Sequence, residues 1–144
     1  MKVGYAVLYE DGELVISKNH SVLKRKIIID YGKFEDINIP WQNESSQIKK
    51  VQISDQVKSN CMKEWFLNCI NLTTLIDFKN LDVSDCTDFS YMFALCESLH
   101  TVLVSNTLSI LRKDMFYKCN PNLKIHWKNH IYTYEDLLEY QTIY

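Results

Sequence analysis

Apolar and polar residues alternate along the first part of the chain, a pattern typical of half-buried β-strands. Residues 2–9 and residues 13–18 are two such runs, and an Asp-Gly pair lies between them. An Asp-Gly pair between β-rich runs predicts a hairpin, because glycine accepts a positive φ. A third strand is predicted over residues 26–31, so we expect residues 1–47 to form a β cap.

From residue 48 onward an aromatic residue, a cysteine and the start of an apolar run recur together. Each repeat phenylalanine is followed three residues later by a cysteine, and successive phenylalanines are 27 and 23 residues apart. A period in the twenties indicates stacked units that each cover the core of the next. Four parallel strands are therefore predicted, with helical or irregular returns whose phenylalanine and cysteine face inward. The repeat residues are Phe66 and Cys69, Phe93 and Cys96, and Phe116 and Cys119.

The last residues of the chain predict a short amphipathic helix that covers the end of the stack. Thr133 precedes Tyr134, and Asp136 follows three residues after the threonine. This spacing is a near match to a capping box, in which side chains at the start of a helix bind free backbone N–H groups.

The central repeat, residues 86–105, reads CTDFSYMFALCESLHTVLVS in one-letter code. It closely resembles the BspA-type bacterial leucine-rich repeat, and the similarity extends over residues 48–127. The resemblance implies a short α/β leucine-rich-repeat solenoid of about four rungs that binds proteins through its strand face. It implies the fold and protein binding in general, but it does not identify a partner. The expected parts are an N-terminal β-hairpin cap (1–47), the repeats (48–131) and a C-terminal capping helix (132–144).

The composition argues against several classes of function. The net charge is −2 and the chain has 3 glycines, so neither a basic nucleic-acid-binding stripe nor a Gly-rich phosphate loop is present. No strained nucleophile turn accompanies the cysteines and histidines, so we expect no enzyme and no cofactor. His126 and His130 are four apart but lie on an expected strand and loop without a third ligand, so no metal is expected.

The five cysteines are an odd number, whereas secreted disulfide scaffolds usually pair their cysteines. Three of them occupy equivalent repeat positions, which indicates small, buried core residues with free thiols. No secretory leader precedes the first strand, and no run approaches 18 apolar residues. We therefore expect a cytoplasmic protein of a bacterium or phage-infected host, without membrane association.

One candidate binding surface is the outward face of the predicted strands. Residues two apart in a strand share a face, so the positions between the core residues point outward. Ile76 and Leu103 would then form an apolar centre with polar and basic neighbours, which suits a protein partner. The alternative is an ordinary exposed sheet face. The predicted partner-binding residues are Lys50, Gln52, Thr74, Ile76, Thr101, Leu103, Lys124 and His126.

A second candidate surface is acidic. Asp82, Asp85 and Asp88 lie in predicted turns within residues 54–99, a stretch of net charge −4. Such a cluster would mimic a phosphate backbone and occupy a basic nucleic-acid channel of a partner. The alternative, which we favour, is that these aspartates cap turns through local hydrogen bonds.

The expected function is non-enzymatic protein binding. Small size, the missing export signal and the acidic turns favour a phage- or mobile-element-encoded inhibitor of a host defence complex, of anti-CRISPR type. Its partner would be a protein, such as a nucleoprotein effector, without direct nucleic-acid binding. The alternative is a BspA-like bacterial surface adhesin or a fragment of one. The sequence leaves the partner's identity and the oligomeric state open.

Overall fold

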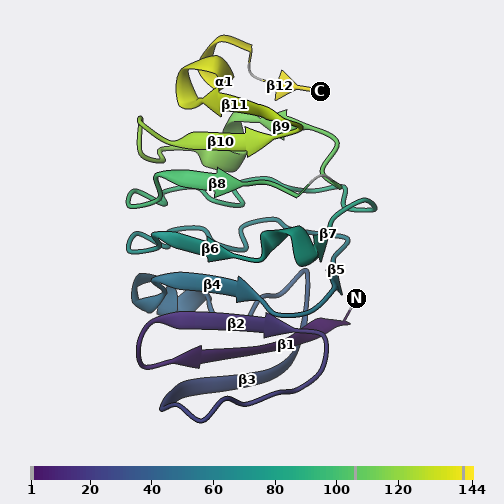
Figure 1. Ribbon diagram of the computed structural model, residues 1–144, viewed down its shortest axis with the longest axis vertical. Helices are drawn as coiled ribbons and strands as arrows, with labels where there is room; N and C mark the ends of the chain where they lie inside the picture. The colour runs from purple at the N-terminus through teal and green to yellow at the C-terminus, as the bar shows by residue number, and fades with distance from the viewer. Residues whose placement is uncertain (1, 106, 141) are drawn as a thin grey trace.

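The computed structural model describes residues 2–105, 107–140 and 142–144, and most of its strands lie one above another along the long axis (Figure 1). The strands are β1 (Lys2–Tyr9), β2 (Glu13–Ser17), β3 (Ile27–Glu35), β4 (Lys50–Ile53), β5 (Val57–Lys58), β6 (Thr74–Ile76), β7 (Leu81–Asp82), β8 (Thr101–Leu103), β9 (Leu111–Arg112), β10 (Lys124–Trp127), β11 (His130–Thr133) and β12 (Thr142–Ile143). The helices are the 3-10 helices η1 (Gln42–Gln47), η2 (Phe78–Asn80) and η3 (Lys113–Phe116) and the α-helix α1 (Tyr134–Tyr140).

The strands form four separate sheets, and this corrects the expected fold class. The sheet orders are β3-β1-β2-β4-β6, β11-β10-β8, β12-β9 and β5-β7. Within the described residues the protein is mainly β, and α1 is the single α-helix. The sheets make no closed or solenoid arrangement, so the expected four-rung α/β leucine-rich-repeat solenoid is wrong.

The physical reason lies in the returns between strands, which are successions of tight turns. Asn68 and Leu95, each directly before a repeat cysteine, have φ values of 62° and 63°. A right-handed helix has no place for a positive φ, so these residues interrupt any helix. The turn segments instead bond to one another, as when Phe66 N–H donates to the Met92 carbonyl at 2.9 Å.

The N-terminal hairpin is confirmed. β1 and β2 pair in antiparallel register, and the turn places Gly12 at φ 86°. A Cβ at Gly12 would stand 3.0 Å from a backbone oxygen. Glycine therefore suits this position for two reasons: it accepts the positive φ, and it has no side chain to crowd that oxygen. β3 is longer than expected and pairs with β1, while β2 pairs with β4 in parallel. One sheet therefore continues across the expected boundary between residues 47 and 48.

The predicted strand register is confirmed in pairs. Val51 lies beside Leu75 on β4 and β6, and Val102 lies beside Ile125 on β8 and β10. β6 and β8 belong to different sheets, however, so the four strands do not form one parallel ladder.

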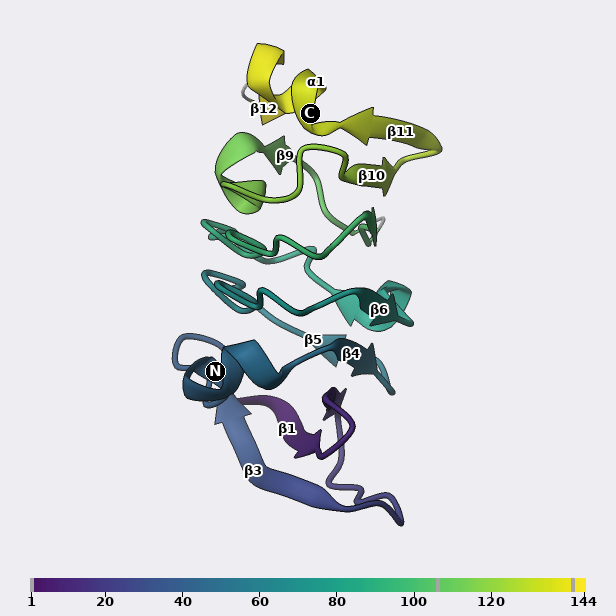
Figure 2. The ribbon, with the colours of Figure 1, turned by 90° about the vertical axis from the view of Figure 1, so that its left-hand side faces the viewer.

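The core contains a continuous stack of aromatic rings. Trp41 stacks on Phe66 with centroids 6.2 Å apart, Phe66 on Phe93 at 5.5 Å, and Phe93 on Phe116 at 5.7 Å. The repeat cysteines lie buried beside this stack, and Cys119 Sγ donates to the Phe93 carbonyl at 2.9 Å. The inward orientation of each repeat phenylalanine and cysteine is thus confirmed. Figure 2 shows the turn segments on the side of the molecule opposite β4, β6 and β10.

The C-terminal helix begins with the expected capping box. Thr133 N–H donates to the Asp136 carboxylate at 2.8 Å, and Asp136 N–H donates to the Thr133 hydroxyl at 3.3 Å. Leu137 is the buried residue of α1 and joins the main core. Among the described residues, no helix has the length and apolar character that crossing a membrane requires.

We expect Cys69, Cys96 and Cys119 to resist alkylation in the native protein at pH 8. All five cysteines are free thiols, and these three are at most 7% exposed. Burial raises the pKa of Cys69 and of Cys119 to about 12, which removes the reactive thiolate. Cys61 and Cys86, which are half-buried, should react before these three. Iodoacetamide labelling with and without urea, read by peptide mass spectrometry, measures this, and rapid native labelling of the three would contradict it.

Candidate functional site

The eight residues predicted on the strand face occur in two groups, because β6 and β8 belong to different sheets. Within each group the residues of one strand lie directly beside those of the other, in parallel register. All eight side chains are exposed or half-buried. The first group, on β4 and β6, is Lys50, Gln52, Thr74 and Ile76; the second, on β8 and β10, is Thr101, Leu103, Lys124 and His126.

The apolar centre of this face differs from the expected one. Leu103 is 61% exposed, whereas Ile76 is half-buried. The second exposed apolar residue is Ile131 on β11, at 51%. His126 pairs with Leu103 on one side and with Ile131 on the other, so the three lie in a row across the sheet. Sequence reasoning missed Ile131, although the β-branched and aromatic residues at 131–133 were the available signal for a strand.

A groove runs along this row, where β8 and β10 end and β11 begins, and all three residues of the row line it. The β10–β11 loop contributes Lys128 to its lining, and η2 contributes Lys79. None of the described residues that line it is an aspartate or glutamate. The lining residues with exposed or titratable side chains are Lys79, Leu103, His126, Lys128, Asn129, His130 and Ile131.

Toward the N-terminus the same face is covered by the chain itself. Val7, Tyr9 and Val15 form a small buried cluster on the outer side of β1 and β2. The Arg25 guanidinium lies 4.2 Å from the centre of the Tyr9 ring, and it donates to the Asp11 carboxylate at 2.8 Å. The basic segment around Arg25 is therefore part of the structure here, and the open face begins at β4.

The predicted acidic residues have local partners. Asp82 accepts a hydrogen bond from the backbone N–H two residues later at 3.0 Å, and Asp88 does the same at 2.9 Å. Hydrogen bonds from those residues hold the pKa of both carboxyls below the usual range. Asp85 pairs with the Lys58 ammonium at 2.6 Å. The Asp82 and Asp88 contacts favour the turn-capping interpretation over an acidic surface that mimics a phosphate backbone, and the Asp85 charge is paired by a lysine.

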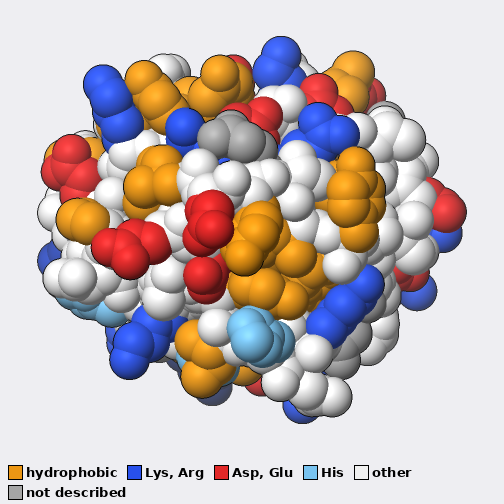
Figure 3. Space-filling view, turned by 90° about the horizontal axis from the view of Figure 1, so that it is seen from above, with side chains coloured by type: hydrophobic (Ala, Val, Ile, Leu, Met, Phe, Trp, Pro, Cys, Tyr) orange, Lys and Arg blue, Asp and Glu red, His pale blue; other side chains and the backbone are white. Residues whose placement is uncertain are grey.

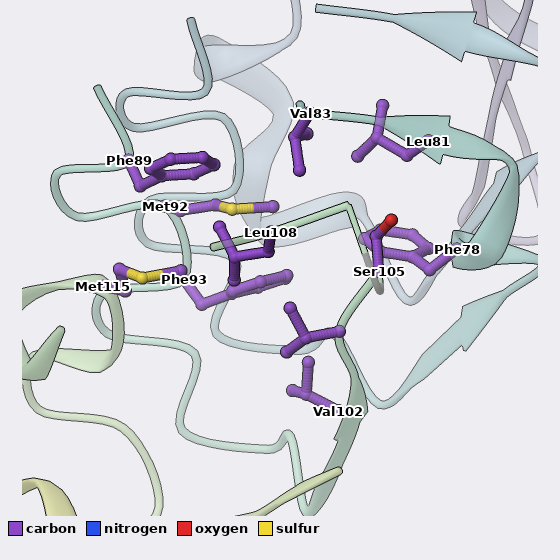
Figure 4. Close-up of a pocket in the computed structure, with 11 residues that line it drawn as sticks. Phe78, Leu81, Val83, Phe89, Met92, Phe93, Val102, Ser105, Leu108 and Met115 are labelled. Carbon is purple, nitrogen blue, oxygen red and sulfur yellow. The ribbon is translucent and has the colours of Figure 1, made fainter. Parts of the chain in front are cut away.

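An apolar cavity of about 20 Å³ lies beside β8 and is shown in Figure 4. Phe78, Phe93, Val102 and Leu108 point into it, and Ser105 is the single polar side chain among the described residues that line it. Ligand sites are usually several hundred Å³ with several converging polar groups. This cavity is a gap in core packing and offers no chemistry.

The C-terminal end of the molecule also exposes apolar side chains. Figure 3 shows hydrophobic side chains gathered near the middle of this end, with lysine or arginine side chains around its margin. Tyr140 is 61% exposed and Tyr144 is 85% exposed. Tyr132, by contrast, packs with its ring centre 6.1 Å from that of Trp127.

The described residues contain no group of three potential metal ligands.

The fold and these surfaces define a mainly β protein with an exposed apolar and basic strand face. No family model, curated protein or solved structure matches the chain. The assignment of function therefore depends on the strand face itself.

Proposed function

We propose that this chain is a non-enzymatic protein-binding module whose contact surface is centred on Leu103. The observation that carries the proposal is the 61% exposure of Leu103, the last residue of β8, with exposed Ile131 in the same row across the sheet. Protein interfaces combine an apolar centre, which contributes most of the binding energy, with a polar rim. Thr101, Lys124 and His126 supply that rim on the adjoining positions.

The free cysteines bear on the compartment in which this binding takes place. Five free thiols, three of them in the core, suit a reducing compartment such as the cytoplasm of a bacterium or phage-infected host. We therefore favour the inhibitor of a host defence complex over the exported adhesin. Asp82 and Asp88 accept hydrogen bonds from nearby backbone N–H groups, and Asp85 pairs with Lys58. These partners support the strand face, rather than the acidic turns, as the proposed contact surface.

Leu103→Asp should reduce capture of the partner more than tenfold. The substitution places a charge where the interface excludes water, and an unpaired buried charge is strongly unfavourable. Stability should change by no more than about 0.5 kcal/mol, because the site is exposed in the free protein. The measurement is affinity capture from cells of the source organism, quantified by mass spectrometry, beside thermal unfolding of each variant.

The matched control is Ile37→Asp, because Ile37 is 73% exposed and lies in the turn after β3, away from the strand face. It should capture the same proteins as the unmodified chain. Equal capture by Leu103→Asp would show that the strand face is not the site. Loss of capture on Asp85→Lys alone would place the contact at the acidic turns.

A further inference from the structure

The charges around the groove at the ends of β8 and β10 are of one sign. Lys79, Lys128, His126 and His130 line it, and the described lining contains no carboxylate. Its apolar surface comes from Leu103 and Ile131. An occupant that complements this groove carries negative charge and at least one apolar side chain.

Lys128 belongs to the tight loop between β10 and β11. Lys128 and Asn129 form the two-residue loop between the paired residues Trp127 and His130, and both have positive φ, 50° and 61°. Such loops favour asparagine and glycine, because other side chains are strained there. Lysine at such a position is therefore less stable than asparagine would be.

The loop also holds the charge in place. The Lys128 ammonium lies 4.4 Å from the centre of the Trp127 ring, within the range of a cation–π interaction. Trp127 itself is 2% exposed. It therefore orients the lysine but offers no stacking surface to a nucleobase, as single-stranded nucleic-acid sites do.

We infer that this groove binds an acidic segment of a partner protein, with one apolar side chain against Leu103 and Ile131 and carboxylates beside Lys79 and Lys128. The inference rests on the proposed protein-binding function and names the chemistry of the partner.

The test begins with selection of phage-displayed random dodecamer peptides on the full-length chain. The enriched peptides are then synthesised, and their affinities are measured by fluorescence anisotropy at 50 and 300 mM salt. We expect enrichment of peptides with net negative charge and a large apolar residue. Their affinity for the Leu103→Asp variant should be at least tenfold lower. Their affinity for the unmodified chain should also be lower at 300 mM salt than at 50 mM, because salt screens exposed charges.

Lys128→Asn separates binding from stability. It removes the charge and supplies a residue that tolerates positive φ, so the protein should unfold at a higher temperature while acidic peptides bind at least threefold more weakly. Lys118→Asn is the matched control. Lys118 also has positive φ, 53°, and lies 5.4 Å from the centre of the Tyr117 ring, but it is not part of the groove. It should gain the same stability and leave peptide affinity unchanged.

Three outcomes would overturn the inference. Leu103-dependent binding of neutral or basic peptides would reject the acidic chemistry while leaving the protein-binding function in place. Enriched peptides that bind equally to the Leu103→Asp variant would reject both this groove and the proposed contact centre. Tighter binding of a 20-nucleotide single-stranded DNA than of any selected peptide would assign the basic groove to nucleic acid.

Discussion

Phe93→Ala lowers the free energy of unfolding by about 3–5 kcal/mol, the usual loss for a deleted buried phenylalanine. The ring is 1% exposed and lies between Phe66 and Phe116 in the aromatic stack, with centroids 5.5 and 5.7 Å away. Its removal takes away one contact surface of each neighbouring ring and enlarges an existing cavity. The loss is comparable to the whole stability of many small domains.

Urea unfolding at 25 °C, followed by circular dichroism, measures the change. Phe93→Leu should lose less, because it keeps much of the apolar volume. Leu103→Ala is the surface control and should stay within about 0.5 kcal/mol of the unmodified chain. An unchanged urea midpoint for Phe93→Ala would show that the stack does not stabilise the fold.

Trp41→Ala should also lower the free energy of unfolding by about 3–5 kcal/mol. Trp41 is fully buried and connects the N-terminal residues to the turn segments. Its indole N–H donates to the Trp65 carbonyl at 2.6 Å, and its ring packs edge-on against Phe34 with centroids 5.0 Å apart. The substitution removes the ring, the hydrogen bond and the first member of the stack together.

Trp41→Phe separates the hydrogen bond from the burial of the ring. It retains an aromatic ring but leaves the Trp65 carbonyl without its donor, which costs about 1–3 kcal/mol. The same urea experiment should therefore place Trp41→Phe between the unmodified chain and Trp41→Ala. Equal stability of Trp41→Phe and the unmodified chain would show that the 2.6 Å contact contributes no net free energy.

The stacked core has a consequence for binding. The strand face is built on strands whose inward residues, such as Val102 and Ile125, are fully buried. Side chains on rigid elements hold their geometry better than side chains on loops. Leu103 and His126, on the outer side of the same strands, are thereby presented in a fixed arrangement.

Local patterns in the sequence determined several features of this protein. The Asp-Gly hairpin, the inward phenylalanines and cysteines, the pairing of Val51 with Leu75 and the capping box at Thr133 all agree with the structure. Each depends on residue type and on spacing within a strand, a turn or one repeat. Such short-range preferences act whatever the rest of the chain does. The exposed position of Leu103 follows from the same strand period.

Only the tertiary structure decided the fold class and the make-up of the binding face. The choice of turns over helices depends on hydrogen bonds between segments more than twenty residues apart, such as Phe93 N–H to the Met115 carbonyl at 2.8 Å. The separation of β6 from β8, and the placement of Ile131 beside His126, also follow from contacts between distant segments. A repeat pattern shows which residues are equivalent, but it does not show how successive segments bond. The hydrogen bonds between segments are made by backbone groups, which are the same in every residue except proline. The pattern of side chains along the sequence therefore does not indicate them.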